Sequence, residues 1–370
     1  MKILFIFKRP VESLVRDIKN KKKPYDSVYG MLNISKNYKI LYKDSIFYKN
    51  KFLQVIQTPL TSLSIYYTNI GFSLIPVLSL IRYVKKSDLV FTTLDTVGLP
   101  LLLLKYLKII DKPIVYGTIG LEHNLQIKHS KIVKFLYSKL LKRADHIVSV
   151  ASFDECKRLS NYLNIPLNKF IFCPFGVDQK YFQPTKIKEE DFILSIGADK
   201  QRDWKTLINS AKYFKLPLVI VSAKGALDNY KVNKKITVYE DLPIENLREL
   251  MAKAKVIVIV LKQTSYFTGQ TTFFQAMSMA KPVVITRIYP FVDYPDILDS
   301  VNCMLCKPGD KKLLIEKTNF LIAKDSLRKS ISRNARKLIL SKYTVGKYAD
   351  RLLNIFEKFN IPDLNSKYEL

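Results

Sequence analysis

The sequence is poor in cysteine and histidine. Its 370 residues include four cysteines, at positions 156, 173, 303 and 306, and three histidines. Four cysteines in a chain of this length do not make a disulfide framework, which excludes the class of small disulfide-bonded secreted proteins. Cys303 and Cys306 have the spacing of half a zinc site, but no second pair of cysteines or histidines accompanies them. We therefore expect no metal there, and interpret the pair as small apolar residues at a strand end.

Acidic residues are also scarce. The chain has 61 Lys and Arg against 32 Asp and Glu, which leaves a formal net charge of +29. Residues 1–175 carry 28 basic and 11 acidic residues, a surplus of 17. Such a charge attracts nucleic acid, an anionic membrane or phosphorylated substrates, although a genome rich in A and T would also add lysines. A nucleic-acid-binding protein stays open on charge alone. Because no zinc finger, aromatic–basic repeat or recognition helix is visible, we expect no specific nucleic acid partner.

Long hydrophobic runs are missing as well. The apolar run from Ile3 to Phe7 is much shorter than the core of a signal peptide, so we expect a cytoplasmic protein. Residues 52–81 contain no charged residue, but polar residues and two prolines interrupt them, so a membrane-spanning helix is not expected. Lys51 and Arg82 flank this stretch. It fits either a helix buried in the core or one at a membrane interface, which would bring the protein to an anionic cytoplasmic membrane face.

What the sequence does contain is an alternation of short apolar runs and helical segments. We predict strands at 2–7, 89–92, 113–116, 146–150, 170–173, 192–196, 218–222, 256–261, 282–286 and 304–306. Buried strands that alternate with helices are typical of parallel sheets, so the fold class is α/β with two Rossmann-like, doubly wound domains. Glycine and proline at 174–184 mark the join. We predict domains at 1–175 and 176–347, and a last segment, 348–370, whose helix packs back toward the first domain.

A first candidate site follows the predicted strand at 192–196. Gly197 ends this strand, and Asp203 is a good N-cap for the next helix. Arg202 and Lys205 lie in or beside the intervening loop. Basic side chains at the carboxyl edge of a parallel sheet, close to a helix start, suit a diphosphate.

A second candidate site follows the strand at 256–261. Gly269 opens a helix and permits close approach of a ligand to the backbone. The free amides at Gly269, Gln270, Thr271 and Thr272, together with the helix dipole, favour anionic oxygens. Gln275 lies farther along the same helix and can offer its side-chain oxygen to a ribose hydroxyl.

These motifs form an ordered set: Gly176-Val-Asp178 with Phe182-x-Pro184, Arg202-Asp-Trp-Lys-Thr-Leu, Gly269-Gln-Thr-Thr with Ala276-Met277, Lys281-Pro-Val-Val and Pro308-Gly-Asp310. In this order they resemble the retaining family-four glycosyltransferases of the GT-B fold, over about residues 173–347. The resemblance implies two Rossmann-like domains that face each other across a cleft. It also implies transfer of a sugar from a nucleotide-diphosphate sugar to an acceptor hydroxyl, with retention of configuration.

The resemblance also implies roles for particular residues. Arg202 and Lys205 would hold the donor diphosphate, and the backbone around Gly269 and Gln270 would bind its distal phosphate. Leu242, in the loop Glu240-Asp241-Leu242, would lie beside the base. His123, after the strand at 113–116, would be the catalytic histidine that faces the transferred sugar, although an ordinary surface histidine in a loop remains the alternative.

Two positions depart from the family pattern. Gln275 stands where the family has the second, ribose-binding Glu of its E-x7-E motif, and Phe267 stands where it has the first. Gln can still hydrogen-bond a ribose but brings no negative charge. A noncatalytic GT-B subunit is therefore an alternative to the enzyme.

The remaining expectations concern the metal and the acceptor. No Asp-x-Asp pair occurs in the chain, which agrees with a metal-independent reaction that needs no cofactor. The basic first half and the uncharged residues 52–81 together suggest an acceptor at a membrane surface, such as a lipid-linked sugar, a glycolipid or a growing surface glycan.

Overall fold

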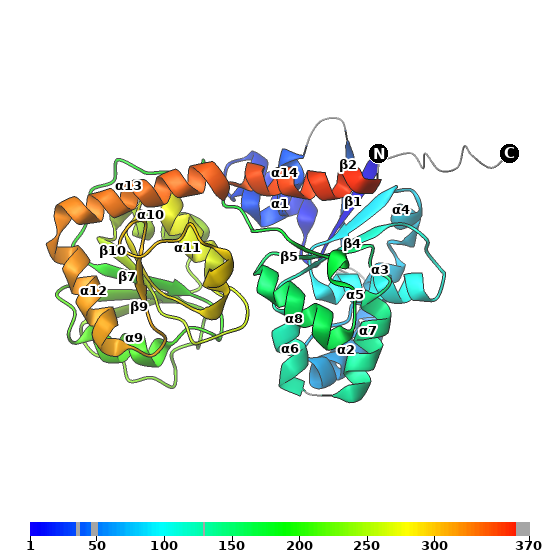
Figure 1. Ribbon diagram of the computed structural model, residues 1–370, viewed down its shortest axis with the longest axis horizontal. Coiled ribbons are helices and arrows are strands. Elements are labelled where there is room, and N and C mark those ends of the chain that lie inside the picture. Colours follow the sequence, from blue (N-terminus) through cyan, green and yellow to red (C-terminus); the bar gives the residue numbers. More distant parts are fainter. Residues whose placement is uncertain (35–37, 46–50, 129, 360–370) are drawn as a thin grey trace. The chain divides into compact units, whose positions relative to one another are not determined.

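The computed structural model describes residues 1–34, 38–45, 51–128 and 130–359. The chain forms two compact units, and its backbone passes between them four times (Figure 1). The first unit comprises Met1–Lys19, Ser27–Pro174 and Gly346–Leu370, and the second comprises Asn20–Asp26 and Phe175–Val345. The segment Asn20–Asp26, which the sequence placed in the first domain, therefore belongs to the second unit.

The first unit is built on a six-stranded parallel sheet in the order β2-β1-β3-β4-β5-β6. Its strands are β1 (Lys2–Phe7), β2 (Lys39–Asp44), β3 (Leu89–Thr92), β4 (Ile114–Thr118), β5 (His146–Ser149) and β6 (Phe170–Phe172). Its helices are α1 (Val11–Lys19), α2 (Lys51–Thr68), α3 (Leu74–Leu78), α4 (Ile81–Lys85), α5 (Asp95–Tyr106), α6 (Leu121–Lys128), α7 (Lys131–Leu141), α8 (Phe153–Leu163) and nearly all of α14 (Val345–Phe356).

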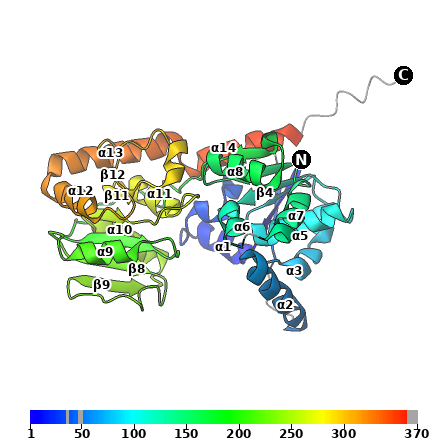
Figure 2. The ribbon, with the colours of Figure 1, turned by 60° about the horizontal axis from the view of Figure 1, so that its bottom comes forward.

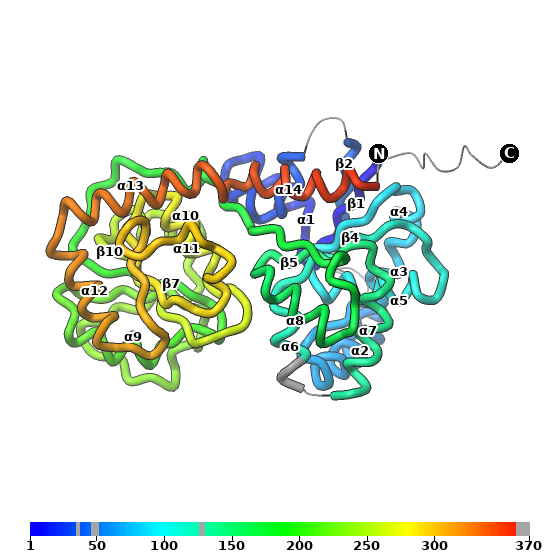
Figure 3. Tube along the Cα trace, in the orientation of Figure 1, coloured from blue at the N-terminus to red at the C-terminus, as the bar shows by residue number. Residues whose placement is uncertain are grey.

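Both faces of this first sheet are covered. Leu4 and Ile6 of β1 pack into a core with α5, α7 and α8. The ring of Phe5, which alternation along the strand places on the other face, lies 6.1 Å from the ring of Phe356 in α14. Figure 3 shows α14, in red, beside the blue N-terminal strand β1. Burial on both faces explains why the strands read as continuous apolar runs.

The second unit has a six-stranded parallel sheet in the order β12-β11-β10-β7-β8-β9. Its strands are β7 (Ile193–Gly197), β8 (Leu218–Ser222), β9 (Ile236–Glu240), β10 (Val256–Ile259), β11 (Val283–Thr286) and β12 (Met304–Cys306). Its helices are α9 (Trp204–Ala211), α10 (Ile244–Lys253), α11 (Gln270–Ser278), α12 (Lys311–Ala323) and α13 (Asp325–Lys342). Leu207 of α9 and Leu314 of α12 pack on this sheet in one core.

The predicted α/β class with two parallel sheets is confirmed, but each sheet has one strand more than the sequence predicted. The two missing strands are β2 and β9, and both lie at an edge of their sheet. Strand β2 is half-buried along most of its length and has a lysine or aspartate at each end. Edge strands commonly carry such charges because one side of the strand faces water. They therefore lack the continuous apolar run by which the other strands were predicted.

The short segment Asn20–Asp26 is held on the second unit by hydrogen bonds between backbone and side-chain groups. The Tyr25 amide donates to the Asp178 carboxylate at 2.9 Å, and the Asp178 amide donates to the Asp26 carboxylate at 3.3 Å. The Tyr181 hydroxyl donates to the Lys22 carbonyl at 3.2 Å. Asp178 belongs to the Gly-Val-Asp motif of the sequence, so one role of this aspartate is to attach the early segment.

The uncharged residues 52–81 form α2, α3 and the first residue of α4. Among the helices that the structure describes, none combines the length and the apolar character that a bilayer crossing requires. Cys303 and Cys306 are buried at the start and end of the β12 region, and burial raises the pKa of the Cys306 thiol to about 11. Within the described residues, no three His, Cys, Asp or Glu side chains group closely enough to hold a metal ion.

Candidate functional site

The two predicted motifs of the second unit meet at the point where its strand order reverses. The chain runs from β7 outward through β8 and β9, and then returns to β10 on the other side of β7. Ligands of open α/β sheets bind at the carboxyl ends of the strands at such a switch point. Arg202 follows β7 and Gly269 follows β10. The two loops are joined directly, since the Asp203 amide donates to the Val260 carbonyl at 2.9 Å.

Two glycines make room for the Arg202 guanidinium. A Cβ atom on Gly197 would lie 1.9 Å from Nε of Arg202, and a Cβ atom on Gly269 would lie 2.3 Å from its Nη1. Neither glycine can therefore carry a side chain without displacing the guanidinium. Gly269 also has φ +70°, which L side chains rarely adopt. The structure thus brings Gly197, Arg202 and Gly269, all predicted from the sequence, into one contact.

The Arg202 guanidinium is a buried cation with hydrogen-bonding capacity left over. The residue is 3% exposed, and burial lowers the pKa of the guanidinium from its usual value. Its Nε lies 3.5 Å from a carboxylate oxygen of the half-exposed Asp199. Nε and Nη1 nevertheless donate no hydrogen bond to any residue that the structure describes. A buried charge with unsatisfied donors is costly, so the arrangement is suited to an anion that takes these hydrogen bonds.

The start of α11 adds further donors beside Arg202. Gly269 is the N-cap of this helix, and the first amides of a helix have no partner within it. Two buried hydroxyls lie at the same edge: Thr268, next to Gly269, and Ser222, which is paired in register with Gly197. Neither hydroxyl has a hydrogen-bond partner among the described residues. Neither residue was predicted from the sequence, although a polar residue at the end of a buried strand was an available signal.

The other predicted donor-binding residues lie around this centre. Asp203 caps α9 as predicted, because its Oδ1 accepts from the Thr206 amide at 3.0 Å. Lys205 is in the first turn of that helix and is exposed. Thr271 is exposed and Thr272 half-buried in the first turn of α11. Leu242 is half-buried after β9, two strands away from β7.

Two side chains in or next to the second motif make contacts within the second unit. The side-chain amide nitrogen of Gln270 donates to the Tyr294 hydroxyl at 2.6 Å, so this group is used within the second unit. Phe267 is 4% exposed and lies in an aromatic cluster, with its ring 4.7 Å from that of Phe291 and 5.0 Å from that of Tyr294. Phe267, which the resemblance aligned with the first Glu, is therefore a core residue, and Gln275 in α11 is also buried.

His123 lies in the first unit, at the third residue of α6 rather than in the loop that the sequence suggested. It is half-buried, and α6 begins three residues after β4 ends. The neighbouring Glu122 is buried and accepts from Nε of Arg158 at 2.7 Å, which fixes α6 to α8. The catalytic role of His123 stays a prediction.

The carboxyl edge of the first sheet holds two buried acids that the sequence analysis did not single out. Asp95, at the start of α5, accepts from the Tyr116 hydroxyl at 2.6 Å. Glu155, in α8, accepts from the Ser149 hydroxyl at 2.6 Å. Burial raises the pKa of Asp95 to about 6 and that of Glu155 to about 8. Glu155 therefore keeps its proton at neutral pH and is able to donate a hydrogen bond.

Comparison with known proteins identifies the second unit most directly. Residues 201–324 match the family model described as "Glycosyl transferases group 1". This range begins next to Arg202 and includes Gly269 and all of α11. No curated protein sequence matches the chain.

Solved structures match both units. Sucrose-phosphate synthase from Thermosynechococcus elongatus is 13% identical, with a TM-score of 0.71 over 97% of this chain and 99% of that one. HepE from Anabaena, in complex with UDP-glucose, is also 13% identical, with a TM-score of 0.71 over 97% and 100%. The lipopolysaccharide outer core galactosyltransferase WaaB is 14% identical, with a TM-score of 0.60 over 97% and 100%. The protein thus has the GT-B fold, and residues 201–324 match the glycosyl transferases group 1 model.

Proposed function

We propose that the protein is a glycosyltransferase whose second unit binds a nucleotide-diphosphate sugar at the carboxyl edge of its sheet. The observation that carries the proposal is the Arg202 guanidinium, which is buried between Gly197 and Gly269 with two N–H groups that donate to no described residue. The group 1 match over residues 201–324 supports a donor diphosphate as the anion of this site. The related HepE structure, which contains UDP-glucose, supports a donor of this class.

The chemistry follows from the charge that develops on the leaving diphosphate. Arg202 would donate to the phosphate oxygens, and the amides of Gln270, Thr271 and Thr272 would point at the same charge from the end of α11. Because the guanidinium is buried, its interaction with an anion is screened less than it would be in water. Lys205 would add a second, solvent-exposed cation. These groups stabilise the leaving group without a metal ion, and retention of configuration follows from the family resemblance.

We further propose that the acceptor is a membrane-associated glycolipid or a growing surface glycan. Two observations support this acceptor class: the surplus of basic residues in the first half of the chain, and the similarity to WaaB, which acts on the lipopolysaccharide outer core. His123 is the proposed catalytic residue on the side of the transferred sugar.

A noncatalytic donor-binding subunit is the second candidate. It is favoured by the place of Phe267, whose side chain is committed to the aromatic cluster and supplies no polar group to a sugar. Gln275 likewise brings no charge to the ribose. This candidate shares the donor site with the enzyme and differs only in turnover.

The first experiment measures the melting temperature with UDP, GDP and ADP. A ligand at about 100 times its Kd stabilises a protein by about 2.7 kcal/mol, which is visible as a shift in melting temperature. We expect one nucleotide to shift the native protein but not the Arg202→Ala variant. Arg333→Ala, which removes an exposed guanidinium from α13, is the matched control and should behave like the native protein.

If no nucleotide shifts the native protein, or if Arg202→Ala retains the full shift, the proposed donor site is wrong. The enzyme and the noncatalytic subunit are then separated by incubating the protein with the matching nucleotide sugar and lipid-linked acceptors. Release of the nucleoside diphosphate that depends on Arg202 supports the enzyme. Binding without release favours the subunit.

A further inference from the structure

Helix α2 of the first unit has its polar side chains turned toward the protein. Gln57 donates to the Phe72 carbonyl at 2.5 Å. The Ser64 and Thr68 hydroxyls donate to the Ile70 carbonyl at 2.7 and 3.1 Å. These residues recur at the spacing of one helical face and are half-buried or buried. The face that holds α2 on the unit is thus hydrogen-bonded rather than apolar.

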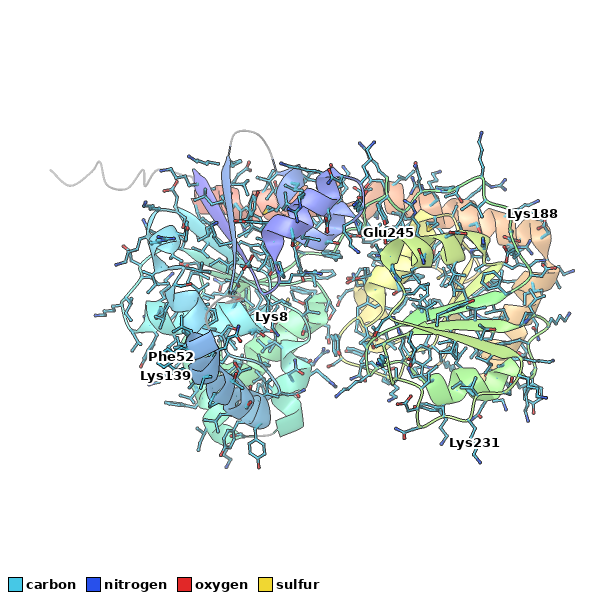
Figure 4. The ribbon with its side chains drawn as sticks, turned by 180° about the vertical axis from the view of Figure 1, so that it is seen from behind. Lys8, Phe52, Lys139, Lys188, Lys231 and Glu245 are labelled. Carbon is cyan, nitrogen blue, oxygen red and sulfur yellow. The ribbon has the colours of Figure 1, made fainter. Side chains whose placement is uncertain are left out.

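The apolar side chains of α2 point away from the unit. Phe52 is 71% exposed, Tyr66 69% and Leu63 59%. Figure 2 shows α2 extending beyond the other helices of the first unit, and Figure 4 labels Phe52 at one end of it. An ordinary surface helix has the opposite pattern, with apolar residues inside and polar residues in water. Exposed apolar residues gathered in this way mark a surface that contacts something other than water.

The two sequence segments that contain α2 and α7 carry charge of a single sign. Residues 45–87, which include α2, contain five Lys and Arg and no Asp or Glu. Residues 123–144, which include α7, contain six Lys and Arg and no Asp or Glu. Tyr137 of α7 hydrogen-bonds to Thr68 at the end of α2, so the two helices are connected. Helix α7 also exposes Ile132 and Phe135 among its lysines.

We propose that α2 is a membrane-docking helix, which inserts its apolar face into the interface of an anionic bilayer while the lysines of α7 contact the lipid head groups. The combination of exposed aromatic and aliphatic side chains with neighbouring lysines is that of helices that lie in a membrane interface. Membrane docking does not depend on the donor chemistry. It rests on the proposed function in one respect: docking would bring the first unit to a lipid-linked acceptor.

A second copy of the chain is the other occupant that this surface could have. The charge pattern argues against it, because two copies that meet through α2 would bring the basic residues of 45–87 and 123–144 together without an acidic partner in either segment. An anionic lipid surface supplies the missing negative charge, so the membrane is the occupant that the surface fits.

The test is sedimentation of the full chain with vesicles made of equal parts phosphatidylcholine and phosphatidylglycerol. The variant Phe52→Asp/Leu63→Asp places charge on the apolar face of α2. The matched control, Phe320→Asp/Leu340→Asp, changes the same residue types at exposed positions of α12 and α13 in the second unit. Both variants lower the net charge equally. We expect the native protein and the control to bind, and the α2 variant to bind at least about tenfold more weakly.

Equal binding of the two variants, or no binding by the native protein, would overturn the proposal. So would a concentration-dependent dimer, formed without vesicles, that only the α2 variant loses, since that result assigns the surface to a second copy. The nucleotide-dependent melting shift is measured on every variant. An α2 variant that keeps this shift is folded and retains its donor site, which separates a failure of membrane docking from a failure of the proposed donor site.

Discussion

The two units share an architecture but bury different kinds of ionisable group, acids in one and an arginine in the other, at the carboxyl edges of their sheets. Each sheet has six parallel strands. The edge of the first sheet holds the buried carboxyl groups of Asp95, Glu122 and Glu155, whereas the edge of the second holds the buried guanidinium of Arg202. The two units thus share one order of strands and helices, and the few residues that follow the strands give their edges different functional groups.

The two edges also differ in how the buried charge is treated. Glu155 accepts from Ser149 and is kept neutral by the shift of its pKa to about 8. Arg202 stays protonated at any ordinary pH, and two of its N–H groups are free of hydrogen bonds to the described residues. The first group avoids a buried charge by staying protonated, whereas the second keeps its charge and is suited to an anion that accepts its hydrogen bonds. Substitutions on either side of this contrast should therefore have different effects.

The largest effect is expected from Gly197→Ala. The added methyl group would lie 1.9 Å from Nε of Arg202, so the guanidinium must leave its place. We expect nucleotide diphosphate affinity to fall by about 3 kcal/mol, on the order of a hundredfold, as it would if the arginine were removed. Isothermal titration measures the change.

The matched control for this substitution is Gly71→Ala in the first unit. Its added methyl group would meet a threonine side chain at 3.3 Å and lies far along the sequence from the donor motifs. We expect this control to bind nucleotide diphosphate with native affinity. If Gly197→Ala also keeps native affinity, nucleotide binding does not depend on the position of the guanidinium beside Gly197, and the proposed donor site is wrong.

An intermediate effect is expected from Glu155→Gln, which should change how the stability of the fold depends on pH. The folded protein holds this carboxyl at a pKa near 8, mainly because of burial, whereas the unfolded chain has the ordinary value near 4.5. Between these values the folded state binds a proton that the unfolded state has lost, so stability falls as the pH rises. We expect the variant to lose this decline and to be more stable than the native protein by on the order of 2 kcal/mol at pH 8.

Urea unfolding at pH 5 and pH 8 measures the difference, with the exposed Glu316→Gln as a control that keeps the native pH dependence. The expected gain in the free energy of unfolding is close to zero at pH 5 and appears at pH 8. If the stability of the variant declines with pH as steeply as that of the native protein, another group causes the decline.

The smallest effect is expected from Lys205→Ala. This side chain is exposed, so solvent and salt screen its attraction to a phosphate. We expect a loss of nucleotide affinity below about 1 kcal/mol that disappears at high salt. Lys212→Ala, at the other end of α9, should have no effect at any salt concentration. A loss as large as that of Gly197→Ala would mean that the exposed and the buried cation contribute equally.

Much of the fold was predictable because parallel strands leave continuous apolar runs in the sequence. Ten of the strands were predicted within a few residues of their ends. Strands β2 and β9 were missed because edge strands are half-exposed and mix polar with apolar residues. The inverted pattern of α2 was not predictable, since the sequence shows only that residues 52–81 lack charge and cannot say which face of the helix meets the protein.

The donor site was predictable as a set of residues but not as an arrangement. Gly197, Arg202 and Gly269 each followed from strand ends and helix starts. Their contact depends on β7 and β10 being neighbours in the sheet, which no local pattern encodes. Asp95 and Glu155 were missed for a related reason: an acid in the first turn of a helix usually caps it in solvent, and only the packing of α5 and α8 buries these two.

The attachment of Asn20–Asp26 to the second unit bears on how the protein can be divided. A fragment that starts at Phe175 would contain every residue of the donor motifs, yet it would lose the groups of residues 20–26 that hydrogen-bond to Asp178 and Tyr181. An excised donor unit would therefore leave the Asp178 amide, one oxygen of the Asp178 carboxylate and the Tyr181 hydroxyl without the partners that the native chain supplies. Fusing residues 20–26 to its N-terminus through a flexible linker is the simplest way to restore them, and a functional isolated unit is to be sought in that form.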